Sequence, residues 1–71
     1  VARSVSDRAK EPAEAPIVLE ENVWLGMRCI VLKGVTIGQN TIVAAGSIVT
    51  RSLPPNVLAG GVPAKVIRSL D

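Results

Sequence analysis

The sequence predicts an all-β fold, a solenoid of short parallel strands, and three observations support this prediction. Val and Ile dominate the apolar residues while Trp24 is the only aromatic residue, and β-branched side chains favour strands. Aliphatic residues recur at every sixth position through the middle of the chain. The pattern stops at two consecutive prolines, Pro54 and Pro55, which cannot donate backbone hydrogen bonds.

The six-residue repeat is the observation that decides the fold. Since about a third of the chain is Val, Ile or Leu, six consecutive matches have a chance on the order of 1%. The matching positions are Leu19, Leu25, Val31, Ile37, Val43 and Val49. Two residues before each of them lies a small or β-branched residue on the same strand face, namely Ile17, Val23, Cys29, Val35, Thr41 and Ser47. We expect both sets to fill the interior.

The residues after the large aliphatics predict the turns. These positions hold Glu20, Gly26, Leu32, Gly38, Ala44 and Thr50. Glycine tolerates the dihedral angles of a tight corner, so each repeat is read as one wall of a triangular prism. Three walls make an 18-residue coil, and coils stack at the strand spacing of about 4.8 Å. Leu19 should then stack on Ile37, and Leu25 on Val43.

The chain is divided into three parts on this pattern. Residues 1–16 mix charges with prolines and predict a lead-in loop. Residues 17–53 form the coils. Residues 54–71 form a closing tail, because the two prolines end the repeat.

The charge distribution favours an anionic ligand. No Asp or Glu occurs between Glu21 and Asp71, while that interval holds Arg28, Lys33, Arg51, Lys65 and Arg68. Such a segment attracts anions. The alternative is a set of solvated surface cations. Nucleic acid is not an expected partner, because the net charge is only +2 and aromatic stacking residues are lacking.

The sequence NVWLGMRCIVLKGVTIGQNTIVAAGSIVT, followed by PPNVLAGGVPAKVIRSLD, resembles the closing coils and tail of the hexapeptide-repeat acyltransferases. The resemblance covers residues 17–68 and implies a left-handed parallel β-helix of about two coils plus a tail. It also implies an enzyme that moves an acetyl group from acetyl-CoA to a hydroxyl or amine of a small acceptor, such as a sugar. The present chain would supply the cofactor-binding coils.

The resemblance also implies a set of cofactor-binding residues. Ala45, Gly46 and Ser47 would lie beside the pantetheine arm. Arg51 would meet the phosphates, with Lys65 and Arg68 as supplementary cations. Pro63 would flank the adenine, and Trp24 would lie near the thiol end of the cofactor or the acceptor pocket.

Two of these residues, Ser47 and Trp24, also have a purely structural interpretation. Ser47 occupies a small interior position, and Trp24 could instead be buried at a subunit contact. Cys29 is interpreted as a small core residue rather than a nucleophile.

No catalytic residue is assigned, because the chain contains no histidine. The resembling enzymes use a histidine as general base, and the stretch RSVSD, with Asp7 as its nearest carboxylate, stands roughly where they carry it. Either the base lies upstream of residue 1, or the protein is a non-catalytic β-helix module that only assembles. A metal protein of the γ-carbonic-anhydrase type is disfavoured because its bridging histidines are missing, and no metal is expected.

The outward positions predict an oligomer. Strand alternation points the residue before each large aliphatic away from the prism, and these residues are Val18, Trp24, Ile30, Thr36, Ile42 and Ile48. Mostly apolar outer walls indicate an interface, and the resembling family is trimeric, so we expect a homotrimer.

The longest apolar runs are far too short to span a bilayer, so we expect no membrane association and a cytoplasmic location.

Overall fold

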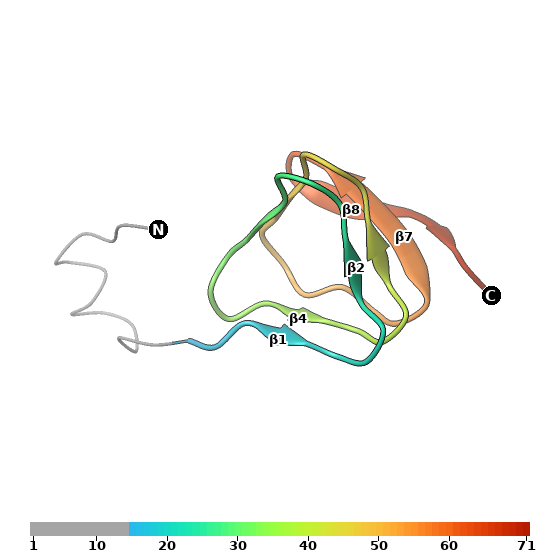
Figure 1. The fold of residues 1–71 in the computed structure, drawn as a ribbon, viewed down its shortest axis with the longest axis horizontal. Coiled ribbons are helices and arrows are strands. Elements are labelled where there is room, and N and C mark those ends of the chain that lie inside the picture. Colours follow the sequence, from blue (N-terminus) through green and yellow to red (C-terminus); the bar gives the residue numbers. More distant parts are fainter. Residues whose placement is uncertain (1–14) are drawn as a thin grey trace, which may run out of the picture.

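The computed structural model describes residues 15–71, so most of the expected lead-in loop, with RSVSD, lies outside the described residues. Strands are the only regular elements of this part, and Figure 1 shows them forming a coil seen end on. They are β1 (Val18–Leu19), β2 (Trp24–Leu25), β3 (Ile30–Val31), β4 (Thr36–Ile37), β5 (Ile42–Val43), β6 (Ile48–Val49), β7 (Val57–Gly61) and β8 (Ala64–Ser69). No helix long and apolar enough to cross a membrane occurs within residues 15–71.

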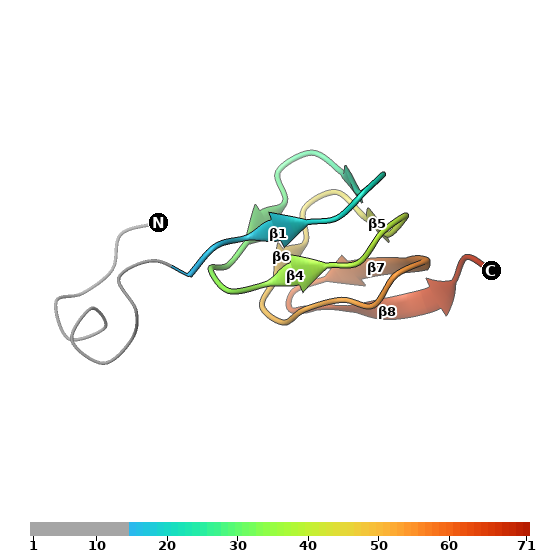
Figure 2. The ribbon, with the colours of Figure 1, turned by 90° about the horizontal axis from the view of Figure 1, so that it is seen from below.

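Three walls enclose the interior, as the repeat predicts. Wall A is β1 with β4, wall B is β2 with β5 and β7, and wall C is β3 with β6. All pairs within a wall are parallel, and Figure 2 shows the coils stacked side by side. The observed partners are Leu19 with Ile37, Leu25 with Val43, and Val31 with Val49. The 18-residue stacking is therefore confirmed.

A third coil follows the second, and it is shorter. Leu53 stacks on Ile37, and Ala59 stacks on Val43, at sixteen positions rather than eighteen. The third coil is two residues shorter because Leu53 follows Val49, the last residue of β6, by four positions instead of six. Strand β8 then turns back and pairs antiparallel with β7.

The prediction that Pro54 and Pro55 end the ladder is wrong. Wall B continues past them into β7. Both prolines are exposed at a corner between walls, where the ladder needs no donor from them. Their neighbours continue the hydrogen bonding, since Gly38 N donates to Leu53 O at 2.9 Å and Asn56 N donates to Gln39 O at 2.9 Å.

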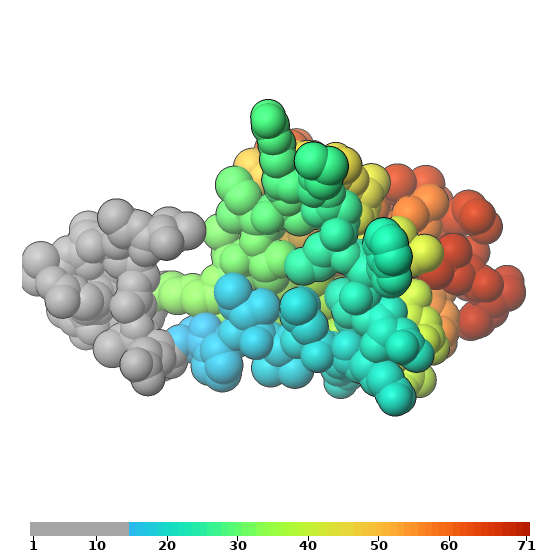
Figure 3. Space-filling model, viewed as in Figure 1, coloured from blue at the N-terminus to red at the C-terminus, as the bar shows by residue number. Residues whose placement is uncertain are grey.

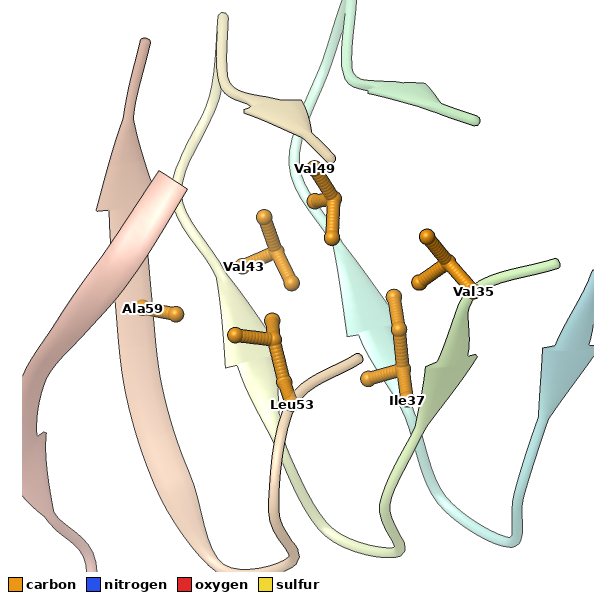
Figure 4. Close-up of a cluster of buried hydrophobic side chains, with 6 residues drawn as sticks. All are labelled: Val35, Ile37, Val43, Val49, Leu53 and Ala59. Atoms are coloured by element: carbon orange, nitrogen blue, oxygen red, sulfur yellow. The ribbon is translucent and has the colours of Figure 1, made fainter. Parts of the chain in front are cut away.

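The core lies in the second and third coils. Its buried apolar side chains point into the prism from all three walls (Figure 4) and are Val35, Ile37, Val43, Val49, Leu53 and Ala59. The corresponding residues of the first coil are more open: Ile37 is 0% exposed while its stacking partner Leu19 is 47% exposed. Among the described residues no further coil covers the first one, whose residues form the face seen in Figure 3.

The corner glycines have a different role from the one predicted. Neither Gly26 nor Gly38 has a positive φ. A Cβ on Gly38 would lie 2.4 Å from Pro55 N, and one on Gly26 would lie 2.5 Å from Ala45 N. Glycine is needed there because the backbone of the next coil passes directly against it.

The left-handed backbone conformation occurs three residues after an interior aliphatic at every corner except the one after Val49, where Ser52 does not adopt it. The residues with positive φ at these corners are Asn22, Arg28, Gly34, Asn40, Gly46 and Asn56. Asparagine tolerates this conformation better than most residues do. The three asparagines stack at one corner, where Asn22 Nδ2 donates to Asn40 Oδ1 at 3.3 Å and Asn40 Nδ2 donates to Asn56 Oδ1 at 2.9 Å.

Candidate functional site

An open pocket of about 380 Å³ lies where the turn after β6 meets the β7–β8 hairpin. Thr50 and Arg51 come from the turn, and Pro63, Ala64 and Lys65 come from the hairpin. The structure thus brings together three predicted site residues, Arg51, Pro63 and Lys65, from segments that are distant in sequence. The peptide bond between Val62 and Pro63 is cis.

The shortened coil explains why Arg51 lines the pocket. Only three residues separate β6 from Leu53, so the chain turns sharply and leaves Arg51 exposed at the bend. Ser52 secures this turn, because its Oγ accepts a hydrogen bond from Thr36 N at 2.9 Å. Lys65, near the start of β8, is exposed as well. The pocket therefore presents two cations and no carboxylate, which suits a phosphate.

Arg68 is not part of this pocket. It lies further along β8, opposite Leu58, and its Nη1 donates to Ser69 O at 3.4 Å. Its place in the cofactor site remains a prediction.

The corner at residues 44–47 leads from wall B to wall C. Ala45 and Gly46 are exposed there, and a Cβ on Gly46 would have nothing within 4 Å. Gly46 has a φ of 76°, and its N–H donates to Met27 O at 2.8 Å. The first coil thus packs against one side of this corner, while the side toward which a Gly46 Cβ would point is open to an extended ligand.

Ser47 belongs to the interior, in agreement with its structural interpretation. Its side chain is 1% exposed. Its Oγ donates to Ala44 O at 2.7 Å and accepts from Gly61 N at 3.0 Å. The hydroxyl is thus already used by the backbone and does not point to a ligand.

Trp24 and Cys29 also lie where the repeat predicts. Trp24 is 70% exposed on the outside of wall B, where it pairs with Ile42. Cys29 is partly buried against the core, and its Sγ donates to Ala44 O at 3.1 Å. No group of His, Cys, Asp and Glu residues within residues 15–71 is arranged to hold a metal ion.

Two pocket residues, Thr50 and Ala64, were not predicted. Each is adjacent in sequence to a predicted cation, so a search of the neighbours of Arg51 and Lys65 would have found them. The hydrogen bond from Gly61 N to Ser47 Oγ was also not predicted, because no pattern of residue types indicates it.

The chain is similar to a known protein family and to acetyltransferases. The model of the family described as "bacterial transferase hexapeptide (six repeats)" matches residues 16–51. Galactoside O-acetyltransferase of Escherichia coli K12 is 52% identical over 56 residues, which are 79% of this chain and 28% of that protein.

Two solved structures are similar as well. A galactoside acetyltransferase in complex with coenzyme A is 51% identical, with a TM-score of 0.79 over 80% of this chain and 28% of that one. A hexapeptide-repeat acetyltransferase from Vibrio cholerae, complexed with acetyl coenzyme A, is 41% identical, with a TM-score of 0.81 over 99% of this chain and 40% of that one. The left-handed parallel β-helix is thereby confirmed. The chain spans well under two thirds of the length of either protein.

Proposed function

The chain belongs to the bacterial transferase hexapeptide family, and on that premise we propose that it supplies the coenzyme A-binding coils of an acetyltransferase. The enzyme would move an acetyl group from acetyl-CoA to a hydroxyl or amine of a small acceptor such as a sugar. One observation carries the proposal: Arg51, Pro63 and Lys65 meet at one open pocket in a segment free of acidic residues. Relatives solved with coenzyme A and acetyl coenzyme A support it.

The residues present fit this cofactor. Coenzyme A carries phosphates at one end, and the pocket offers the Arg51 guanidinium and the Lys65 ammonium with no carboxylate beside them. Its pantetheine arm is long and narrow, and the exposed backbone at Gly46 has open space above it. When bound, acetyl-CoA would supply an acetyl group activated as a thioester.

The roles of this chain's residues in the proposed reaction are binding and orientation. Arg51 and Lys65 would hold the phosphates by charge-assisted hydrogen bonds. Ala45 and Gly46 would let the arm approach the backbone, and Trp24 would lie near the thiol end. The acceptor must also lose a proton to a general base, and no residue of this chain is assigned that role.

A second hypothesis is a non-catalytic module that only assembles, for which the apolar outer surfaces of walls B and C would be sufficient. Binding of coenzyme A distinguishes the two hypotheses, because a module that only assembles has no need of it.

We also propose that the protein is a homotrimer. Walls B and C both carry apolar residues on their outer surfaces, since Trp24 pairs with Ile42 and Ile30 pairs with Ile48. Three of these four are exposed in the single chain, with Ile48 half-buried. Two apolar walls that meet at a corner suit three-fold packing, in which each wall contacts a different neighbour.

We place the protein in the cytoplasm because its proposed donor is an intracellular metabolite.

Replacing Arg51 with alanine should weaken coenzyme A binding. Loss of one charge-assisted contact costs about 1.5–3 kcal/mol, which corresponds to a roughly 10-fold to 150-fold higher Kd. Isothermal titration calorimetry of the chain with coenzyme A measures this. Arg28→Ala is the control, because it removes an exposed cation of the same acid-free segment outside the pocket. Equal affinity for Arg51→Ala and the unmodified chain would remove Arg51 from the site.

A further inference from the structure

Two hydroxyl side chains lie in the buried core of residues 15–71. Thr41 is 0% exposed and Ser47 is 1% exposed, and they are the buried polar side chains of this part of the chain. Both occupy the small interior position of the repeat. Buried hydroxyls cost free energy unless they are hydrogen bonded, so their partners indicate why the core contains them.

Each hydroxyl accepts a hydrogen bond from one end of β7. Thr41 Oγ1 donates to Pro54 O at 2.7 Å and accepts from Val57 N, the first residue of β7, at 3.4 Å. Ser47 Oγ accepts from Gly61 N, the last residue of β7, at 3.0 Å. The two side chains therefore fix opposite ends of one strand.

The Ser47 hydroxyl bridges the end of β7 to Ala44, one residue beyond the end of β5. In a parallel pair, a residue whose N–H and C=O face the neighbouring strand bonds to the two residues that flank its partner. Ala44 N donates to Ala59 O at 2.9 Å, so a regular ladder would have Gly61 N donate to Ala44 O. Instead, the Ser47 hydroxyl lies between these two groups, accepting from Gly61 N and donating to Ala44 O at 2.7 Å.

The Ser47 hydroxyl bonds to the last residue before the hairpin turn. Gly61 leads directly into Val62, Pro63, Ala64 and Lys65, and the last three of these line the pocket with Arg51. The preceding residue, Gly60, is packed tightly at the same place, since a Cβ on it would lie 3.0 Å from the Ala44 Cβ. The end of β7 is thus held against the corner at residues 44–47.

We propose that Ser47 is a positioning residue for the proposed cofactor site: its hydroxyl bridges Ala44 and Gly61 and so sets the separation between the Pro63–Lys65 turn and Arg51. This inference rests on the proposed function. It assigns Ser47 a role through the hairpin and not through direct contact with the cofactor.

Three variants of the complete chain test the proposal. Ser47→Ala removes the bridge next to the pocket. Thr41→Val removes the hydroxyl at the other end of β7 and serves as the matched control. Ser47→Thr keeps the hydroxyl, and Thr41 shows that the interior position of this repeat accepts threonine.

Two quantities are measured for each variant, the exchange rate of the backbone amides by NMR and the Kd for coenzyme A by calorimetry. For Ser47→Ala we expect the Gly61 amide to exchange about five- to tenfold faster and the Kd to rise by a similar factor, the value of one hydrogen bond. Thr41→Val should accelerate exchange at Val57 and leave the Kd within about twofold. Ser47→Thr should restore both quantities.

The outcomes separate the two proposals. If the unmodified chain does not bind coenzyme A, the proposed function fails, and the positioning role fails with it. If the unmodified chain binds but Ser47→Ala has the same Kd, or Thr41→Val weakens binding equally, only the positioning role is overturned. Should Ser47→Ala not fold, Ser47→Cys takes its place: a thiol sulfur is only a weak acceptor for Gly61 N, so the Kd should rise in the same direction by a smaller factor, and an unchanged Kd would overturn the positioning role.

Discussion

Replacing Ile42 and Ile48 together with lysine is expected to dissolve the proposed trimer and to abolish coenzyme A binding with it. Each side chain lies in the middle of an outer apolar ladder, Ile42 beside Trp24 and Ile48 beside Ile30. Assembly would bury both, and an unpaired buried ammonium costs several kcal/mol. The corner at residues 44–47 joins walls B and C, so the proposed site for the pantetheine arm lies beside the subunit contact and should be lost when the subunits separate.

Light scattering at tens of micromolar and calorimetry with coenzyme A measure the two effects. Val18→Lys is the matched control, because Val18 is an exposed β-branched residue on the outside of wall A. It should leave a trimer that still binds. A monodisperse monomer for the unmodified chain, or an intact trimer for the double variant, would contradict the assignment of walls B and C as the interface.

Gly38→Ala is expected to cause the largest loss of stability of any single methyl addition to a corner. The new Cβ would lie 2.4 Å from Pro55 N and 2.7 Å from Pro54 C, both backbone atoms of the third coil. That coil cannot move without breaking the bond from Gly38 N to Leu53 O. We therefore expect the free energy of unfolding to fall by about 3 kcal/mol, the upper end of the usual cost of overpacking.

Gly34→Ala provides the comparison for this variant, measured by urea unfolding. Gly34 has a φ of 79°, and its nearest neighbour would be the Ala15 Cβ at 3.7 Å. Gly34→Ala should lower the free energy of unfolding by only about 1–2 kcal/mol, because it places an L-residue in the left-handed conformation without a clash. An equal or smaller loss for Gly38→Ala would show that close approach of the coils does not explain the glycine at that corner.

The solenoid and its register could be predicted from the sequence because one spacing determines both. An aliphatic side chain at every sixth position has a place only if each repeat forms one wall. The pairing of Leu25 with Val43 then follows from the 18-residue coil, and it is observed. The shorter third coil was missed because Leu53 breaks the period. Its signal was present, since Leu53 and Ala59 are themselves six residues apart.

The corners were predicted less well because two different constraints act within each turn. Close approach of the next coil selects glycine at Gly26 and Gly38. The left-handed conformation selects Gly or Asn two residues later, but Arg28 adopts it as well. Glycine thus meets both constraints at different positions of a corner. Arg28 stands where most corners have Gly or Asn, so the residue pattern of the left-handed position is harder to recognise.

The candidate site was predicted in part. Resemblance named Arg51, Pro63 and Lys65, which the structure gathers at one pocket, but it also named Arg68, which lies outside that pocket. The role of the Ser47 hydroxyl could not be predicted. It depends on Gly61 N lacking its regular ladder partner, which is a consequence of how β7 leaves the coil.

The most direct test of the central claim is to map where coenzyme A binds, by following backbone amide chemical shifts of the chain as the ligand is added. The proposed function predicts saturable shifts at Ala45, Gly46 and Arg51 and in the hairpin turn at residues 61–65, with little change in the first-coil strands β1 and β3. Absence of saturable shifts, or shifts confined to the open face of the first coil, would contradict it.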